Sequence, residues 1–361
     1  MISKDILYMR RALGLARKAE GKTSPNPVVG CVIVKNGKIV GEGFHRCYGS
    51  AHAEVEALKK AGGNAKGAVM YVTLEPCSHW GKTPPCVEAV IKAGIVKVVA
   101  AMADPNPLNN GKSFKILKQH GVSVVIGACA VEARAMNAAF VKYMNKGMPF
   151  VTAKSAQTLD GNIGVRGGKT VWITANGTRA LAKQRRAQFD AILVGVNTVI
   201  ADDPLLDAPG KKIRKIIVDS TLRTPREAKM LKNAAPGQVI LAVTKKAPLA
   251  RRKQFEAAGT EVLVCPIRRG RVNLQWLLKA LAKNKIMSIL IEGGASVIGS
   301  ALQDALVDRL HVYIAPKVLP QGFEQSLVAG LDVSELIRAS KFRISAMRCV
   351  APDLFMELQK E

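Results

Sequence analysis

Hydrophobic and polar positions in the first 150 residues follow the periods of helices and strands in turn. Apolar side chains in residues 4–20 recur at the spacing of one helix face and predict a helix. Two apolar runs, 28–34 and 38–40, flank Asn36-Gly37, a pair typical of a tight hairpin turn. Beyond them the pattern predicts helices at 52–60, 84–93, 113–119 and 131–145, and strands at 68–74, 96–101 and 122–126. A hairpin followed by alternating helices and strands is typical of a layered α/β domain.

The pattern restarts after Lys146, where Gly147 and Pro149 interrupt it. We therefore predict two domains, residues 1–148 and 149–361. In the second domain, apolar runs predict strands at 150–155, 191–196, 213–218, 239–243 and 288–291, helices at 179–189 and 274–283, and a final pair of strands at 310–315 and 342–350. This half is also predicted to be α/β.

Composition agrees with two domains, because 361 residues exceed what one hydrophobic core usually supports. The net charge of +27 is spread over both halves, which predicts a generally basic surface that attracts anionic small molecules, with no nucleic-acid partner. Charges at Lys4, Asp5, Arg10 and Arg11 argue against a signal peptide, and no apolar run is long enough to span a bilayer. We expect a cytoplasmic protein without a membrane partner. Seven cysteines, an odd number, favour metal binding or burial over disulfides.

The strongest chemical signal is His52-Ala53-Glu54, followed by Pro76-Cys77 and by Cys86. One imidazole and two thiolates suit a catalytic zinc ion, which leaves its fourth position to water. In nucleobase deaminases such a trio activates a water molecule while a glutamate that is not a ligand moves the proton. The sequence therefore predicts one Zn²⁺ per chain, held by His52, Cys77 and Cys86, with Glu54 as the catalytic acid and base.

The run TLEPCSHWGKTPPC at 73–86, with eight residues between its cysteines, resembles the deaminase half of the bifunctional riboflavin biosynthesis deaminase-reductase family. PNPVVG at 25–30 and DPNP at 104–107 resemble its substrate loops. The resemblance implies a cytidine-deaminase-like α/β/α layered domain that deaminates 2,5-diamino-6-(5-phosphoribosylamino)pyrimidin-4-one to 5-amino-6-(5-phosphoribosylamino)uracil. The substrate contacts that it implies are Asn26, His45, Lys82, Asp104 and Asn106.

The second half lacks a G-x-G-x-x-G motif, which gives no support to a Rossmann dinucleotide site. This half has instead a glycine turn in EGGASVIGS at 292–300. Together with KSAQTLDG at 154–161, WIT at 172–174, DDP at 202–204 and VDS at 218–220, this turn gives the second half a resemblance to the reductase half of the same family. The resemblance implies a dihydrofolate-reductase-like α/β domain that uses NADPH to reduce the ribosyl group to ribityl, in a homo-oligomer. The implied NADPH contacts are Ala156, Trp172, Thr198, Asp202, Ser220, Gly294, Ala295, Ser296, Val297, Ile298, Gly299 and Ser300. The implied substrate contacts are Lys154, Thr170, Arg186, Leu206 and Glu292.

One segment departs from the family. The usual Thr-x-Arg after Asp-Asp-Pro-x-Leu is replaced by Asp207-Ala208-Pro209, so an expected phosphate-binding arginine is missing. Either a cation among Lys211, Lys212 and Arg214 compensates, or the reductase affinity is reduced. Two alternatives to a bifunctional enzyme follow: a deaminase with a degenerate, non-catalytic second half, and a nucleic-acid deaminase, motivated by the charge. The wide spacing of the cysteines and the reductase-like second half disfavour the latter.

Overall fold

The computed structural model describes residues 4–81, 84–164, 172–319 and 341–361 of the chain. These residues form two compact units, Met1–Gly147 and Met148–Glu361. In the described part of the chain, no helix combines the length and the apolar character needed to cross a membrane.

The first unit is built on a five-stranded sheet with the order β2-β1-β3-β4-β5. Its strands are β1 (Gly30–Lys35), β2 (Lys38–Phe44), β3 (Val69–Val72), β4 (Lys97–Ala100) and β5 (Ser123–Ile126). The β1–β2 hairpin turns at Asn36-Gly37, where both residues have positive φ, as the sequence predicts. β1 pairs antiparallel with β3, whereas β3, β4 and β5 run parallel.

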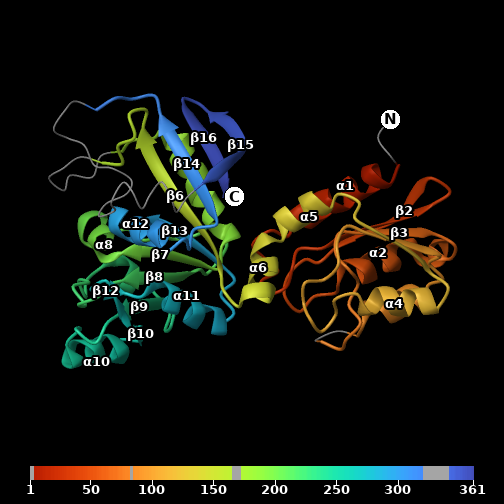
Figure 1. Cartoon of the computed structure of the whole chain (residues 1–361), viewed down its shortest axis with the longest axis horizontal. Coiled ribbons are helices and arrows are strands. Elements are labelled where there is room, and N and C mark those ends of the chain that lie inside the picture. The colour runs from red at the N-terminus through yellow and green to blue at the C-terminus, as the bar shows by residue number, and fades with distance from the viewer. Residues whose placement is uncertain (1–3, 82–83, 165–171, 320–340) are drawn as a thin grey trace. The chain divides into compact units, whose positions relative to one another are not determined.

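Helices cover both faces of this sheet (Figure 1). The helices are α1 (Lys4–Arg17), α2 (Ala53–Ala61), α3 (Cys86–Lys92), α4 (Lys112–Gln119), α5 (Ala130–Met136) and α6 (Ala138–Lys146), with a 3-10 turn at Gly62–Ala65. α1 and α5 lie above the sheet and α2 and α4 below it in Figure 1. Glycines in the sheet allow α1 and α2 to approach closely. A Cβ on Gly30 would lie 2.0 Å from the Ala12 carbonyl oxygen of α1, and a Cβ on Gly43 would lie 2.3 Å from the Ala53 carbonyl oxygen of α2.

The single helix predicted at 131–145 is wrong, because the chain breaks it at Asn137 into α5 and α6. The Asn137 side chain accepts a hydrogen bond from the Val28 N–H at 2.9 Å and donates one to the Val28 carbonyl at 3.0 Å. The Asn137 backbone, with φ −99 and ψ 22, departs from helical geometry at the residue whose side chain the distant loop holds. This bond connects α5 and α6 to the loop that precedes β1.

The second unit is built on a nine-stranded sheet with the order β10-β9-β8-β7-β13-β6-β14-β16-β15. Its strands are β6 (Phe150–Thr158), β7 (Ala191–Gly195), β8 (Arg214–Val218), β9 (Val239–Val243), β10 (Glu261–Val264), β13 (Ser288–Gly293), β14 (Arg309–Ala315), β15 (Phe342–Val350) and β16 (Asp353–Lys360). A separate small hairpin consists of β11 (Ile267–Arg268) and β12 (Arg271–Val272). In the order of this sheet, every neighbouring pair between β10 at one edge and β14 is parallel. A parallel sheet of this kind is covered on both faces, so its central strands are buried on both sides.

Successive residues of the central strands alternate between two cores. The helices of this unit are α7 (Asn176–Arg185), α8 (Val196–Asp202), α9 (Lys229–Lys232), α10 (Leu249–Ala257), α11 (Leu274–Lys283) and α12 (Ala295–Gln303), with a 3-10 turn at Arg186–Gln188. Ile216 and Ile240 pack on one face with helices α11 and α12, and Ile217 and Leu241 pack on the other with α8, α9 and α10. The unit is a three-layer α/β domain.

The predicted pairing of 310–315 with 342–350 is wrong. β16 lies between them and pairs antiparallel with both β14 and β15. β15 and β16 are joined by a turn at Ala351-Pro352, and closing a short hairpin has a lower entropic cost than pairing strands across a long connection.

Candidate active sites

Three predicted zinc ligands converge in the first unit. His52 is the N-cap of α2, Cys86 is the first residue of α3, and Cys77 lies in the loop after β3. The His52 Nδ1 atom lies 3.1 Å from Cys86 Sγ and 3.4 Å from Cys77 Sγ, and all three donor atoms lie within 4.8 Å of one another. One imidazole and two thiols, with a cavity beside them for a fourth ligand, fit a catalytic zinc ion.

The surroundings of Cys77 favour the thiolate, the form that binds metal. Hydrogen bonds from the Cys86 thiol, from His52 and from the Cys86 N–H, the last at 3.2 Å, lower the pKa of Cys77 to about 4. The N–H groups at the start of α3 add to this effect, since a helix N-terminus favours negative charge. Cys77 can therefore supply an ionised sulfur to a metal ion.

Glu54 lies two residues after His52 on α2, and its side chain lines the same cavity. It is only 3% exposed. Burial, reinforced by the charge of Cys77, raises the pKa of Glu54 to about 7. A carboxyl group with this pKa can both accept and release a proton near neutral pH, as a general acid and base must.

The cavity of the first unit has a volume of about 430 Å³. Predicted substrate residues that line it are Asn26, His45, Asp104 and Asn106. His45 Nδ1 lies 3.1 Å from the Ala51 carbonyl, so this nitrogen donates and Nε2 accepts from the Asn26 amide at 3.1 Å. Burial lowers the pKa of His45, which favours this neutral form. The predicted Lys82 lies outside the described residues.

Sequence reasoning missed Glu75 and Asn109, which hold the loops of this cavity. The Glu75 carboxylate accepts hydrogen bonds from the N–H groups of Asp104, Gly111 and Ser113 and from the Ser113 hydroxyl. Asn109 donates to Asp104 Oδ2 at 3.2 Å and to the carbonyl of the proline before Cys77. The sequence signal that could have revealed Glu75 is its place at the end of a buried strand, directly before the loop that carries the predicted ligand Cys77.

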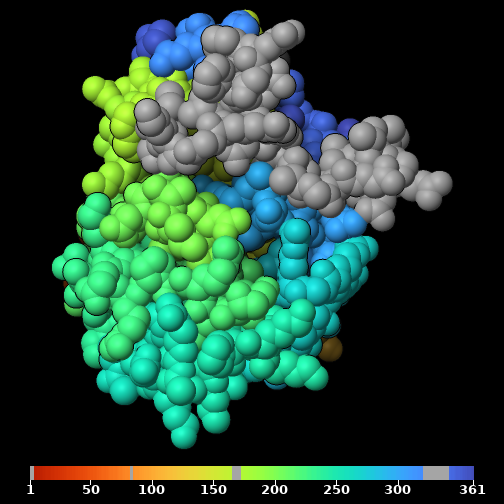
Figure 2. Space-filling view, turned by 90° about the vertical axis from the view of Figure 1, so that its left-hand side faces the viewer, coloured from red at the N-terminus to blue at the C-terminus, as the bar shows by residue number. Residues whose placement is uncertain are grey.

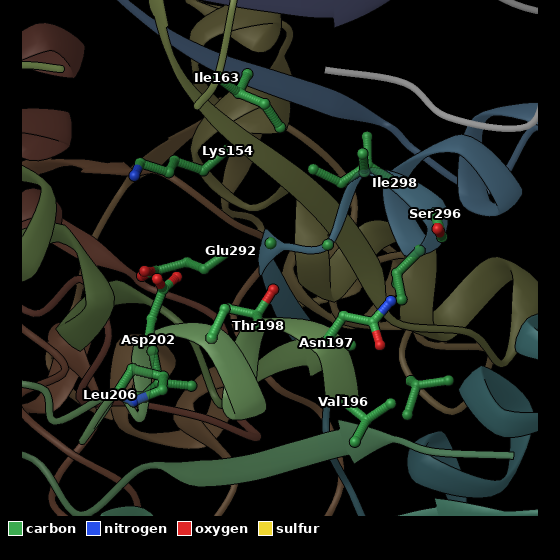
Figure 3. Close-up of a pocket in the computed structure, with 18 of the residues that line it drawn as sticks. Lys154, Ile163, Val196, Asn197, Thr198, Asp202, Leu206, Glu292, Ser296 and Ile298 are labelled. Atoms are coloured by element: carbon green, nitrogen blue, oxygen red, sulfur yellow. The ribbon is translucent and has the colours of Figure 1, made fainter. Parts of the chain in front are cut away.

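A much larger cleft, about 1480 Å³ in volume, opens in the second unit. It lies beyond the carboxyl ends of the parallel strands β6, β7, β8 and β13, where α/β proteins commonly bind ligands. Figure 2 looks onto the face of this unit where green residues from the middle of the chain adjoin the blue α12. In Figure 3, Lys154, Asp202 and Glu292 lie toward one end of the cleft, and Ser296 and Ile298 of α12 toward the other.

Arg186 and Glu292 form a bidentate ion pair at this cleft, with N–O distances of 2.6 and 2.8 Å. Arg186 also donates to the Asp207 carbonyl at 3.1 Å, which connects the pair to the loop carrying Leu206. Burial lowers the pKa of Lys154, while Glu292 counteracts this and Arg186 adds to it. The fold brings these charges together from β6, the 3-10 turn after α7 and β13.

The glycine turn leads from β13 into α12 at the cleft. Gly294 has φ +82, which only glycine adopts without strain. A Cβ on Gly293 would also lie 3.2 Å from the Thr198 hydroxyl oxygen. The first N–H groups of α12 can therefore face an anionic ligand at close range, as at other helix N-termini that bind phosphate.

Most residues implied as NADPH contacts line this cleft. The residues in question are Ala156, Trp172, Thr198, Asp202, Ser220, Gly294, Ala295, Ser296, Val297, Ile298 and Ser300. Gly299 is instead on the buried face of α12, and Thr170 lies outside the described residues. Trp172 is exposed, with the Arg179 guanidinium 4.4 Å from its ring centre.

None of the three cations considered as replacements for the missing arginine lines the cleft. Lys211 donates to the Phe189 carbonyl at 2.7 Å, and Arg214 pairs with Glu261 at 3.2 Å. Lys212 is exposed. Within the described residues, the cations that line the cleft come from other segments and are Lys154, Arg179, Lys183, Arg186, Arg223 and Arg271.

Comparisons with known proteins show which family each unit resembles. Residues 149–354 match the RibD C-terminal domain, and residues 2–102 match the cytidine and deoxycytidylate deaminase zinc-binding region. The riboflavin biosynthesis protein RibD of Actinobacillus pleuropneumoniae is 41% identical over 356 residues, 98% of this chain and 94% of the relative. The solved structure of Acinetobacter baumannii RibD, form 1, has a TM-score of 0.88 and 37% identity, with 99% of each chain covered. A Thermotoga maritima structure, described as a diaminohydroxyphosphoribosylaminopyrimidine deaminase/5-amino-6-(5-phosphoribosylamino)uracil reductase, has a TM-score of 0.84 and 31% identity, again with 99% of each chain covered.

A zinc-type deaminase unit followed by a reductase unit makes this chain a bifunctional enzyme, and the predicted fold class is confirmed. A reductase half is not expected of a nucleic-acid deaminase. The chain belongs to the RibD family of riboflavin biosynthesis proteins.

Proposed function

We propose that the chain catalyses two consecutive steps of riboflavin biosynthesis. The first converts 2,5-diamino-6-(5-phosphoribosylamino)pyrimidin-4-one to 5-amino-6-(5-phosphoribosylamino)uracil by hydrolysis, and the second reduces the ribosyl group of that product to ribityl with NADPH. The observation that carries the proposal is the buried Glu54 beside three convergent zinc ligands. The activity named for the Thermotoga maritima relative supports this choice of substrate.

In the deamination step, His52, Cys77 and Cys86 would hold the zinc ion. When bound, zinc supplies the Lewis acidity that makes a water molecule nucleophilic at neutral pH. Glu54 accepts a proton from the attacking water and passes it to the ring nitrogen beside C2. It then moves the proton of the added hydroxyl group to the 2-amino nitrogen, so that the carbon–nitrogen bond breaks, ammonia leaves and the carbonyl forms. The pKa of about 7 suits both halves of this transfer.

Polar side chains around the cavity would orient the pyrimidine and its ribose phosphate. Asp104 and Asn26 offer acceptors and donors to the edge of the base, and Asn106 and His45 line the same space. Lys82 would neutralise the phosphate. The bond from Asn109 to Asp104 fixes one carboxylate oxygen, which leaves the other to the substrate or to the N–H of Asn106.

In the reduction step, the glycine turn and α12 would bind the diphosphate of NADPH, which supplies the hydride when bound. Arg186, Glu292 and Lys154 would hold the ribosyl group at the other end of the cleft. Lys154 can carry a proton at Nζ beside the Glu292 carboxylate and pass it to the opening sugar, because burial lowers its pKa. A cleft of about 1480 Å³ exceeds the size of an ordinary ligand site and has room for cofactor and substrate together.

The substitution Glu54→Gln tests the proposal. We expect ammonia release from the diaminopyrimidine substrate to fall by roughly 1,000-fold or more, because the proton carrier is lost. NADPH oxidation with the deaminated uracil intermediate should stay within about twofold of the wild type, and bound zinc should remain at one per chain.

Glu56→Gln is the matched control, since Glu56 lies on the same helix but pairs with Arg46 outside the cavity. It should leave both activities unchanged. Deamination that survives Glu54→Gln contradicts the role of Glu54, and an absence of NADPH oxidation in the wild type contradicts the second step.

A further inference from the structure

One end of the cleft in the second unit is formed by two loops that carry cations. Ser220 and Arg223 belong to the turn after β8, and Arg271 belongs to the β11–β12 hairpin. All three residues line the cleft. Neither arginine has a part in the two steps proposed above.

Hydrogen bonds hold the two loops together. The N–H of Val272 donates to the Ser220 hydroxyl oxygen at 3.2 Å, so the hydroxyl keeps its own proton to donate to a ligand. The buried Asp219 carboxylate closes the turn by accepting from the N–H and the hydroxyl of Thr224 at 2.7 and 2.8 Å. This end of the cleft is therefore preorganised.

The β11–β12 hairpin carries three arginines with different surroundings. Arg268 and Arg269 both pair with Asp304, at 3.1 and 3.2 Å. Arg271 lines the cleft, and among the residues that the structure describes no carboxylate pairs with it. Its charge is thus available to an anionic group bound in the cleft.

The position of this end suits the adenosine part of a dinucleotide. In the sheet, β8 is separated from β13 by β7 alone, so their ends lie about 10 Å apart. With the diphosphate at the start of α12, the adenosine ribose reaches toward the turn after β8. A second phosphate on that ribose would meet Ser220 and Arg271.

We propose that Arg271, with the Ser220 hydroxyl, binds the 2′-phosphate of NADPH and thereby selects NADPH over NADH. Arg223 supports this site from the side, since it donates to the Asn197 side chain at 2.6 Å and adds positive charge. The inference rests on the proposed use of NADPH in the reduction step, and it names the residue that distinguishes the two cofactors.

The test compares Arg271→Gln with Arg269→Gln, which removes the same charge from the same hairpin but from the Asp304 pair. We expect Arg271→Gln to lower kcat/KM for NADPH by about 10-fold to 100-fold, mainly through KM, and to leave kcat/KM for NADH within about twofold. The Kd of 2′,5′-ADP for the protein without cofactor, measured by titration calorimetry, should rise in parallel, while the Kd of 5′-AMP should not change. Arg271→Lys should keep part of the preference, and Arg269→Gln should keep all of it.

An equal loss with NADPH and NADH overturns the inference, because it signals a general disturbance of the cleft. An equal effect of Arg269→Gln also overturns it, because the hairpin then acts only through its total charge. A wild-type enzyme that uses NADH and NADPH equally well overturns the inference, whereas one that oxidises neither cofactor contradicts the proposed function itself. A strong preference for NADPH that Arg271→Gln leaves intact contradicts only the role of Arg271.

Discussion

The two sites differ in how their residues are distributed along the chain. In the first unit, the ligands and Glu54 lie at the starts of α2 and α3 and in the loop after β3, and chemically distinctive residue types mark them. In the second unit, Lys154, Arg186 and Glu292 come from β6, the turn after α7 and β13, and only the strand order brings them together. A site of soft metal ligands can be recognised from residue types, whereas a site of ordinary charges depends on the fold.

The largest effect that would sharpen this contrast is the loss of a zinc ligand. We expect Cys86→Ser to reduce bound zinc to well below one per chain and to lower deamination by roughly 1,000-fold or more, because a hydroxyl is a poor substitute for a thiolate. NADPH oxidation with the deaminated substrate should be unchanged. Zinc content by atomic emission and the two separate assays measure these outcomes.

Cys47→Ser is the control for this experiment, since Cys47 is an exposed thiol of the same unit that lies outside the ligand trio. It should retain full zinc content and both activities. If Cys86→Ser impaired the reductase as strongly as the deaminase, the two sites would not be independent in the way that their separate units indicate.

A packing change in the first unit should have the next largest effect. In Gly43→Ala, the new Cβ would lie 2.3 Å from the Ala53 carbonyl oxygen and push α2, which begins beside His52, away from the sheet. We expect the free energy of unfolding to fall by about 3 kcal/mol, within the range of severe overpacking. Chemical denaturation of the purified protein, followed by zinc retention, measures the effect.

Gly14→Ala is the matched control, because nothing lies within 4 Å of the Cβ position on α1. This change should stabilise the protein by about 0.5–1 kcal/mol, since alanine favours a helix more than glycine does. A Gly43→Ala variant as stable as the wild type would mean that α2 can shift freely, contrary to the close packing described above.

The cleft of the second unit should respond to the loss of one charge. Glu292→Gln leaves Arg186 without its bidentate partner, and we expect kcat/KM of the reductase to fall by about 30-fold, the order of one charge-assisted hydrogen bond. Deamination should not change. Glu227→Gln, which removes a carboxylate that pairs with Lys232 in the same unit outside the cleft, should leave the reductase unaltered and serves as the control. A reductase whose kcat/KM is unaffected by Glu292→Gln would contradict the role proposed for Glu292.

The sequence predicted the parts of this molecule that depend on local pattern or on unusual residue types. The hairpin at Asn36-Gly37 and most strands follow from local periodicity, and the zinc trio follows from its chemistry. The break at Asn137 and the position of β16 could not be predicted in this way. The break accompanies a bond to a loop distant in sequence, and the position of β16 results from a competing hairpin. Glu75 was missed for the same reason, since its role appears only in the hydrogen bonds that it accepts from another loop.

The smallest effect concerns the stability of the second unit and involves Lys154. Burial lowers the folded-state pKa of Lys154 below its ordinary value of 10.5, so between the two values the unfolded chain binds more protons at this group. This group therefore destabilises the fold at neutral pH, and stability rises as the pH increases through that window.

Lys154→Met removes the buried charge, and we expect it to raise the free energy of unfolding at pH 7 by about 1 kcal/mol. The variant should also lose the part of the pH dependence above neutrality that is due to this group. Denaturation at pH 7 and pH 9 tests this, and a variant less stable than the wild type at pH 7 would show that electrostatic attraction to Glu292 outweighs the cost of burial. The reductase would then keep its charges for stability as well as for catalysis, and the contrast with the deaminase site, where buried Glu54 serves the chemistry, would be weaker than proposed.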